Sequence, residues 1–276
     1  MSGKLEGQVA FITGAARGQG RSHALALAKE GADIIAVDVS QQVETVPYAT
    51  ATAEDMAETV RQVEALDRRI IAGDVDVRDL QGLTEFVDRG VAELGRLDIV
   101  LANAGISAPA PTLEMDEETW DTMIEINLTG VWKSIKASVP HIVEGGRGGS
   151  VVITSSTAAI IPMANIAHYA AAKSGLVLLS KVLAKELAPQ SIRVNTVHPT
   201  TVATDMVLNE STYQLFRPDL EHPTREDFEE AARTLNALPI AAMEASDITN
   251  AVLYLVTDSG RYVTGTMHVV DAGSAL

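Results

Sequence analysis

Short apolar runs rich in β-branched residues alternate along this chain with longer segments of helical periodicity. The apolar runs are VAFIT, DIIAVD, RIIAGDV, DIVLANAG, SVVITS, IRVNTVHP and MHVVDAG, and patterns such as SHALALAKEG and LTEFVDRGVAELG separate them. Strands that alternate with helices need crossover connections, which place the strands parallel and cover both faces of the sheet with helices. The alternation therefore predicts an α/β chain with a doubly wound parallel sheet. Ligands of such sheets bind outside the carboxyl ends of the strands, where the strand order reverses.

Length and composition favour a single domain. With 276 residues and a hydrophobic content of 46%, the chain can bury a substantial core. Neither a Pro/Ser-rich linker nor an internal repeat divides it. We therefore expect one domain over residues 1–276.

The charge and the N-terminal sequence argue against several classes of partner. A net charge of −16 disfavours nucleic acids and anionic membranes, because binding to either depends on lysine and arginine. Without cysteine there is no disulfide or thiolate chemistry. The start, MSGKLEGQVAFITG, lacks a basic segment followed by a long apolar one, and no run of about 18 apolar residues occurs. We expect a cytoplasmic protein that does not bind membranes or nucleic acid.

The first strand runs directly into a glycine-rich turn, TGAARGQG, and then into a helix. Gly14, Gly18 and Gly20 would let the backbone turn sharply and approach a pyrophosphate, which the N–H groups at a helix N-terminus attract. The alternative is an ordinary tight loop between strand and helix.

The second strand ends in Asp38, about 20 residues after the glycine turn, the usual position of an acidic ribose ligand. Its carboxylate can accept a hydrogen bond from the adenosine 2′-hydroxyl and would repel a 2′-phosphate, so it favours NAD over NADP. Arg17 in the turn could instead meet a 2′-phosphate. We favour the alternative that Arg17 is a solvated loop arginine.

A second motif, HYAAAKSG, places Tyr169 four residues before Lys173 in a helical pattern, so the two side chains project from one face. An ammonium group and a nearby nicotinamide cation would favour the phenolate and make Tyr169 a usable general base. The alternative is a lysine that packs its stem against a half-buried ring. Upstream, Ser156 stands at a strand end and can hydrogen-bond an alcohol oxygen, whereas we expect Ser155 to satisfy backbone groups.

Two histidines, His168 and His198, lie near these motifs. No carboxylate or ligand cluster accompanies either of them in the sequence. Both are therefore expected to be structural, and no metal is expected.

The motifs TGAARGQG, NAG and YAAAK, together with Asn127 and the serine pair, resemble the short-chain dehydrogenase/reductase superfamily, whose fold is a single Rossmann domain. The match spans nearly the whole chain. It implies that Tyr169 is the general acid/base, that Lys173 activates it and binds ribose, and that Ser156 binds the substrate oxygen. It also implies that Asn127 is a link in a proton relay, although a structural amide is an alternative.

The same resemblance implies contacts with NAD along the chain. Val202 and Thr204 would meet the nicotinamide carboxamide, and Asp76 and Val77 would lie by the adenine, although GDVDVRD also permits a register that uses Asp74. The Asn103 side chain is expected to be structural while its loop contacts the cofactor. The full set of expected NAD contacts is Gly14, Arg17, Gly18, Gln19, Gly20, Asp38, Asp76, Val77, Asn103, Ala104, Gly105, Tyr169, Lys173, Pro199, Val202 and Thr204.

Three segments are similar to the mycofactocin-coupled, carveol-dehydrogenase-like branch of the superfamily. They are GAARGQGRSHALALA, VETVPYATATAEDMAETVRQVEALDRR and NESTYQLFRPDLEHPTREDF. This likeness implies tightly held NAD, oxidation of a lipophilic secondary alcohol to a ketone, and reoxidation by the redox partner mycofactocin.

Two insertions accompany this likeness. The insertion near 41–53 follows the Asp38 strand and is placed to fold over the adenosine; the alternative is a surface decoration. The segment near 206–238 follows Thr204 and is placed to cover the substrate. Its apolar residues would either face that substrate or pack as core; they are Met206, Leu208, Tyr213, Leu215 and Phe216.

Two other functions compete with this one. One is a freely exchanging NAD(P)H-dependent carbonyl reductase that uses Arg17 for NADP, and the other is an NAD-sensing protein without turnover. The complete set of Asn127, Ser156, Tyr169 and Lys173 disfavours the sensor. A homotetramer is expected, because the Asn127 and Tyr169 helices carry broad apolar faces and members of the resembling family commonly pair such helices.

Overall fold

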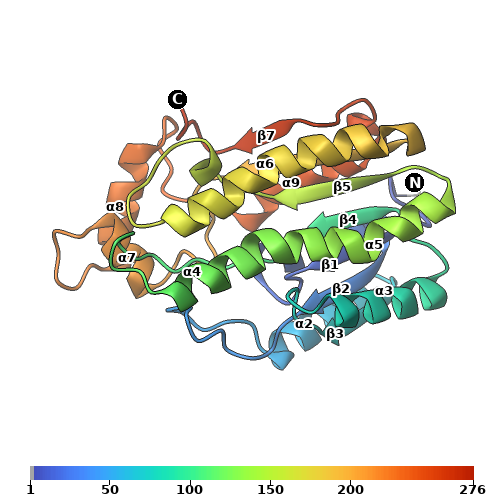
Figure 1. Cartoon of the computed structure of the whole chain (residues 1–276), viewed down its shortest axis with the longest axis horizontal. Helices are drawn as coiled ribbons and strands as arrows, with labels where there is room; N and C mark the ends of the chain where they lie inside the picture. Colours follow the sequence, from blue (N-terminus) through green and yellow to red (C-terminus); the bar gives the residue numbers. More distant parts are fainter. Residues whose placement is uncertain (1–2) are drawn as a thin grey trace.

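Seven parallel strands form the central sheet in the computed structural model, which describes residues 3–276 (Figure 1). The strands are β1 (Val9–Thr13), β2 (Asp33–Asp38), β3 (Ile70–Asp74), β4 (Ile99–Ala102), β5 (Gly149–Thr154), β6 (Ile192–Pro199) and β7 (Met267–Val270). Their order is β3-β2-β1-β4-β5-β6-β7, and neighbouring strands pair in parallel. Each apolar run of the sequence is one of these strands, so the predicted doubly wound α/β fold is confirmed.

Helices connect the strands and cover both faces of the sheet (Figure 1). They are α1 (Gly18–Lys29), α2 (Ala53–Glu64), α3 (Leu80–Leu94), α4 (Glu117–Ile124), α5 (Val131–Gly145), α6 (Ala167–Leu187), α7 (Glu210–Phe216), α8 (Arg225–Leu235) and α9 (Ala245–Val256). A π-helical segment, Glu125–Gly130, joins α4 to α5. Within residues 3–276, none of the helices combines the length and apolar character needed to span a membrane.

Strand side chains alternate between two hydrophobic cores. In β1, Val9 and Phe11 join the core beneath α3, α5 and α6, whereas Ala10 and Ile12 join the core beneath α1, α2 and α9. Consecutive strand residues project to opposite faces, so a strand covered on both sides is apolar along its length. The continuous run VAFIT, rather than an alternating one, follows from this double burial.

Side-chain caps fix where the helices near the insertions begin. The Thr52 hydroxyl accepts a hydrogen bond from the Asp55 N–H, and the Asp55 carboxylate accepts one from the Thr52 N–H. This capping box starts α2 at Ala53, so the first insertion ends at its cap. Thr224 and Asp227 form the same box at the start of α8.

The first insertion, residues 41–52, has neither helix nor strand, yet it packs against the body of the domain. Val43 and Val46 are buried against a cluster that includes Ile106 and Met123. The Gln42 side chain donates a hydrogen bond to the Val46 carbonyl oxygen and accepts one from the Thr50 N–H, both within the insertion. The insertion is therefore held by buried apolar contacts, which a surface decoration would lack.

The second insertion forms a small helical unit with its own core. Phe228 of α8 is fully buried, and the rings of Tyr213 and Phe216 lie 5.2 and 5.0 Å from it, centre to centre. Leu208 packs against the same cluster. Of the two alternatives left open for these residues, Leu208, Tyr213 and Phe216 follow the core-packing one, because two short helices need an apolar centre of their own.

Candidate active site

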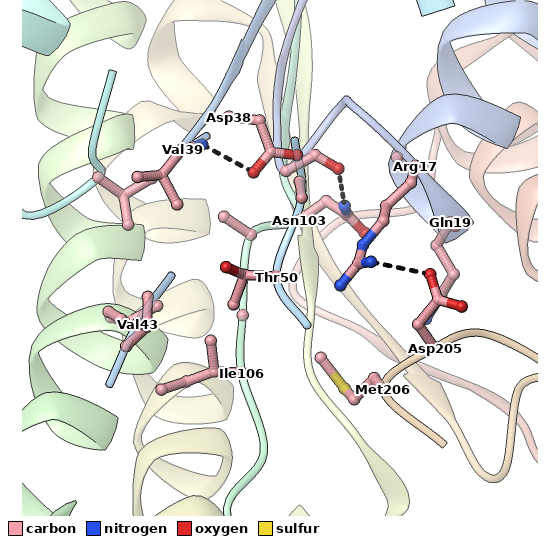
Figure 2. A pocket seen from close by; sticks show the side chains of 18 of the residues that line it. Arg17, Gln19, Asp38, Val39, Val43, Thr50, Asn103, Ile106, Asp205 and Met206 are labelled. Atoms are coloured by element: carbon pink, nitrogen blue, oxygen red, sulfur yellow. Dashed lines mark hydrogen bonds and ion pairs between the residues drawn. The ribbon is translucent and has the colours of Figure 1, made fainter. Parts of the chain in front are cut away.

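A pocket opens at the carboxyl ends of the strands, where the strand order reverses between β1 and β4. This is the expected ligand position in a doubly wound sheet. Figure 2 shows side chains from the glycine turn, the end of β2, the first insertion and the segment after β6 around it. The expected cofactor contacts that line it are Gly14, Arg17, Gly18, Gln19, Gly20, Asp38, Asp76, Val77, Asn103, Ala104, Gly105 and Thr204. The others, Tyr169, Lys173, Pro199 and Val202, lie outside its lining.

The glycine turn packs so closely against neighbouring backbone that a side chain does not fit at two of its positions. Gly14 has a φ of +67°, and a Cβ there would lie 2.8 Å from the Ala104 Cα. A Cβ at Gly20 would lie 1.9 Å from the Gly14 carbonyl oxygen. No side chain caps the N-terminus of α1, so its first N–H groups can serve an anion. These features fit the pyrophosphate prediction.

Two backbone N–H groups hold the Asp38 carboxylate at the end of β2. The Ala16 N–H donates to Oδ2 and the Val39 N–H donates to Oδ1, both at 2.9 Å. Burial raises the pKa of Asp38, and these N–H groups and the charge of Arg17 only partly oppose the rise. Each carboxylate oxygen keeps a lone pair, so Asp38 can still accept a hydrogen bond from a ribose hydroxyl.

Of the two possible registers after β3, the pocket contains the one with Asp76. Asp76 and Val77 line the pocket, whereas Asp74 is exposed and accepts a hydrogen bond from the Ser40 N–H at 3.1 Å. The Arg78 guanidinium pairs with Asp76 at 2.6 Å. Burial acts to raise the pKa of Asp76, but the hydrogen bonds and the charge of Arg78 together outweigh this effect, so the net shift of the pKa is downward.

Asn103 ties three strand ends together beneath the pocket. Its Nδ2 donates to the carbonyl oxygens of Thr13 and Gly14 at 3.2 and 3.3 Å, and the Thr154 hydroxyl donates to its Oδ1 at 3.2 Å. The N–H groups of Asn103 and Ala104 both donate to the Thr13 hydroxyl oxygen. The Asn103 side chain is therefore structural, as expected, and contact of its loop with the cofactor stays a prediction.

The first insertion supplies part of the pocket wall. Val43, Tyr48, Thr50 and Ala51 line it, and the Tyr48 hydroxyl accepts a hydrogen bond from the Ser107 N–H at 3.2 Å. Burial raises the pKa of Tyr48 to about 12, so its phenol is neutral. The position of the insertion after β2 predicts its approach to the pocket, but nothing in the sequence singles out Tyr48.

Tyr169 and Lys173 meet on one face of α6, as their spacing predicts. The Lys173 Nζ lies 5.6 Å from the centre of the Tyr169 ring and donates a hydrogen bond to the Thr154 carbonyl oxygen at 2.8 Å. Burial lowers the pKa of Lys173 to about 8. Burial also raises the pKa of Tyr169, although the Ser156 hydroxyl opposes that rise. Both groups are pushed toward their neutral forms, so in this buried site Tyr169 holds its proton more tightly and Lys173 holds its proton less tightly than usual.

The two serines at the end of β5 have different partners. The buried Ser155 hydroxyl donates to the Lys173 carbonyl oxygen at 3.0 Å, so its expected structural role is confirmed. The Ser156 hydroxyl oxygen accepts from the Ala158 N–H at 3.1 Å and faces the Tyr169 phenol closely enough to affect its pKa. Ser156 and Tyr169 therefore present two hydroxyl groups to the same space.

His198 hydrogen-bonds to the backbone of Ser156. The ring is fully buried, and its Nδ1 lies 2.9 Å from the Ser156 carbonyl oxygen, which can only accept, so Nδ1 carries the proton. Its Nε2 then accepts from the Thr196 hydroxyl at 2.7 Å. Burial lowers the pKa of His198, which keeps the ring neutral. The sequence indicated only local structure here, because Ser156 lies 42 residues away along the chain.

Asn127 lies in the π-helical segment with its side chain fully buried. Its Oδ1 accepts from the Ile106 N–H and its Nδ2 donates to the Ile106 carbonyl oxygen, both at 2.8 Å, while Nδ2 also contacts the Met123 Sδ. The side chain thus fastens the loop after β4, as the structural alternative holds. A proton relay through Asn127 stays a prediction. Because the side chain is engaged with Ile106 and Met123, the relay would have to use the backbone of Asn127.

Gly105 connects the pocket to the catalytic candidates. It lines the pocket, and a Cβ there would lie 3.2 Å from the Asn127 Oδ1 and 3.4 Å from the Lys173 Nζ. Tyr169 packs on the same apolar cluster as Tyr48 and Ile106. The structure therefore brings the four predicted catalytic residues together at this end of the pocket.

The segment after β6 closes the opposite side. Thr204 faces the glycine turn, where a Cβ on Gly18 would lie 3.3 Å from its Cγ2. Val202 is buried behind it in a β-bridge to Met243, and Pro199 ends β6. Of the apolar residues expected to face a substrate, Met206 lines the pocket.

Known proteins share this fold. Residues 8–214 match the short chain dehydrogenase family. The (-)-trans-carveol dehydrogenase of Rhodococcus erythropolis is 56% identical over 274 residues, covering 99% of each chain. The crystal structure of carveol dehydrogenase from Mycobacterium avium in complex with NAD superposes with a TM-score of 0.97 at 52% identity. The crystal structure of a short chain dehydrogenase from Mycobacterium paratuberculosis bound to NAD superposes with a TM-score of 0.91 at 44% identity. Each comparison covers 99% of both chains. The predicted family is confirmed: the chain belongs to the short-chain dehydrogenases.

Proposed function

We propose that this protein is an NAD-dependent dehydrogenase that oxidises a lipophilic secondary alcohol to the ketone. One observation carries the proposal: the pocket that Asp38 lines extends to Gly105, and Lys173 lies beside Gly105, next to Tyr169 and Ser156. An NAD sensor would need the pocket but not these three groups. Two full-length relatives named as carveol dehydrogenases support the alcohol as substrate class.

The pocket fits NAD at each place where this chain can be examined. The uncapped start of α1, which follows directly on the tightly packed glycine turn, suits a pyrophosphate. Asp38 suits an adenosine with a free 2′-hydroxyl. The predicted cofactor is borne out by the two similar structures, both of which are NAD complexes.

In this account, the side chains handle the proton of the alcohol. NAD, when bound, would supply the hydride acceptor. Tyr169 takes the hydroxyl proton, and Ser156 donates a hydrogen bond to the oxygen as its negative charge grows. Lys173, with a pKa of about 8, is mostly charged at neutral pH and stabilises the tyrosinate. His198 holds the Ser156 backbone in place.

An apolar substrate suits the lining near the catalytic groups. Ile106 and Ile126 line the pocket and belong to the cluster that Tyr169 packs against, and the phenol of Tyr48 accepts a hydrogen bond from the Ser107 N–H. Arg17 is the one basic side chain in the lining described within residues 3–276. It lies near Asp38, at the end of the pocket where we place the adenosine of NAD, called the adenosine end below. Apart from Lys173, which donates to the Thr154 carbonyl oxygen, the described lining near the reacting groups offers a phosphorylated alcohol no cation.

Retention of NAD is supported by the first insertion. Val43 and Ala51 are both buried and line the pocket, so a bound adenosine would be enclosed by chain anchored on a hydrophobic cluster. Enclosure slows release. Reoxidation by mycofactocin stays a prediction from the family resemblance, and a freely exchanging reductase is the competing function.

A homotetramer is supported by apolar side chains on one face of the domain. Trp132 of α5 and Leu178 and Val182 of α6 are 41%, 68% and 47% exposed. Both helices lie on the same side of the sheet (Figure 1). Exposed large apolar side chains on helices of one face are what an interface between subunits would bury.

The proposal is tested by dialysing the purified protein exhaustively, adding (-)-trans-carveol, and identifying the dinucleotide released on denaturation by mass. Release of NADH, in place of the NAD released without carveol, is the expected result. An empty protein that oxidises carveol with added NAD would support the freely exchanging alternative. A protein that binds NAD but reduces none of it with any secondary alcohol would contradict the proposed activity.

A further inference from the structure

Arg17 of the glycine turn joins three segments around the adenosine end of the pocket. Its Nη1 pairs with the Asp205 Oδ2 at 2.9 Å, and its Nη2 donates to the Ala49 carbonyl oxygen in the first insertion. Asp205 directly follows Thr204 at the start of the second insertion. Figure 2 shows the guanidinium turned toward Asp205 across the mouth of the pocket. Arg17 is therefore an engaged arginine, which corrects the expectation of a solvated one.

The position of Arg17 matters for the choice of dinucleotide. Its charge lowers the pKa of Asp38, although burial of Asp38 dominates and raises it, so the two groups lie within electrostatic range. The next cation, Arg21, is occupied by the Thr59 hydroxyl and by Asp55. Arg17 is thus the cation that could meet a 2′-phosphate beside Asp38.

We propose that Asp205 is a specificity residue for the cofactor, and that it selects NAD by holding Arg17 away from the 2′-position of the adenosine ribose. This inference rests on the proposed function. A 2′-phosphate brings about two negative charges next to Asp38 and needs a guanidinium to offset them. With Arg17 neutralised by Asp205, that compensation is lost, and the carboxylate of Asp205 adds repulsion of its own. An adenosine with a free 2′-hydroxyl needs no such cation.

The chain offers a matched control for Asp205. Asp219 forms a pair of similar length, 2.8 Å, with Arg217, and its side chain is 61% exposed against 66% for Asp205. Asp219 lies outside the pocket lining. Substituting either aspartate with asparagine removes the same bulk charge, but Asp205→Asn alone releases Arg17.

The test measures binding of adenosine fragments by calorimetry, with the full-length protein freed of dinucleotide. The probes are 5′-AMP and 2′,5′-ADP, followed by NAD and NADP. We expect Asp205→Asn to raise the affinity for 2′,5′-ADP relative to 5′-AMP about tenfold, the size typical of a recovered charge-assisted contact. Asp219→Asn should leave that ratio unchanged. Adding Arg17→Gln to Asp205→Asn should abolish the gain, because the gain runs through Arg17.

Three results would overturn the inference. They are an unchanged affinity ratio in Asp205→Asn, the same gain in Asp219→Asn, and a gain that survives Arg17→Gln. The second and third would assign the effect to net charge alone. A wild-type protein that binds neither 5′-AMP nor NAD would instead contradict the proposed function, so the two failures are distinguishable.

Discussion

The two ends of the pocket are built from different kinds of contact. At the catalytic end, buried polar side chains bond to the backbone: Lys173 to Thr154, Ser155 to Lys173, and His198 to Ser156. At the adenosine end, an insertion without regular structure packs Val43 on an apolar cluster, and an ion pair with an exposed aspartate completes the rim.

This difference indicates a division of labour. Catalysis needs groups fixed to within a fraction of an ångström, and backbone-directed hydrogen bonds in a buried site provide that. Cofactor capture needs a surface that can open, and a loop held by apolar packing and a surface ion pair opens at lower cost. Substitutions at the catalytic end should therefore change kcat, and substitutions at the adenosine end should change cofactor binding.

The largest expected effect is at Tyr169. Tyr169→Phe removes the proton acceptor while keeping the ring, so kcat for carveol oxidation should fall about 10³-fold with NAD affinity changed little. Steady-state kinetics and NAD titration measure the two quantities. Tyr254→Phe, on the far side of the domain in α9, is the matched control. Equal kcat in Tyr169→Phe and wild type would refute the assignment.

At the same end, Lys173→Met should lower turnover yet stabilise the fold. Burial lowers the pKa of Lys173 from 10.5 to about 8, which corresponds to a cost of roughly 3 kcal/mol to the folded state. The substitution removes this cost, but it also removes the hydrogen bond to Thr154, whose loss destabilises the variant by about 1 kcal/mol. We therefore expect a gain of about 2 kcal/mol in the free energy of unfolding at neutral pH, measured in urea.

The pH dependence of that gain has a definite sign. Below pH 8 the lysine is protonated in both folded and unfolded states, so the cost of its burial is fully present. Between about 8 and 10.5 the unfolded state binds more protons, so wild-type stability rises with pH and the advantage of Lys173→Met shrinks. The exposed Lys181→Met is the control. A pH-independent difference, or a less stable variant at neutral pH, would contradict this account.

A smaller effect is expected at His198, which positions Ser156. His198→Ala should lower kcat about tenfold, because the Ser156 backbone loses its donor. His198→Asn places an N–H near the former Nδ1 and should recover most of the rate. Loss of a buried imidazole elsewhere, in His23→Ala, controls for packing. If His198→Asn did not recover kcat, His198 would contribute through packing alone and not through its hydrogen bond to Ser156.

The smallest effect is expected at the rim. Val43→Ala removes methyl groups that line the pocket, so NAD should dissociate about fivefold faster while the rate of hydride transfer is retained. Stopped-flow displacement of NAD measures this rate, with the exposed Leu235→Ala as control. Unchanged dissociation would mean that the insertion does not contact the cofactor. This substitution is cleaner than a deletion that includes Thr52, which caps α2.

The sequence predicts the parts of this molecule that follow from local pattern. Buried strands reveal themselves as apolar runs, and the four-residue spacing of Tyr169 and Lys173 places both on one helical face. The glycine turn and Asp38 are predictable because backbone geometry demands those residue types at those positions.

The remaining features depend on contacts between distant segments. His198 meets Ser156, and Arg17 meets Asp205, only because the fold brings different strand ends together. The apolar residues of the second insertion illustrate the same limit: composition alone does not distinguish a substrate wall from a small core around Phe228. The difference is set by where α7 and α8 pack, which no local pattern encodes.

The central claim is direct hydride transfer from an alcohol carbon to NAD in this pocket. The most direct measurement uses carveol that carries deuterium on the carbinol carbon, followed by mass analysis of the dinucleotide from a single turnover. The account predicts NADH that contains one deuterium in the wild-type protein, formed about 10³-fold more slowly in Tyr169→Phe. Reduced dinucleotide without deuterium, or labelled NADH formed equally fast by Tyr169→Phe, would contradict it.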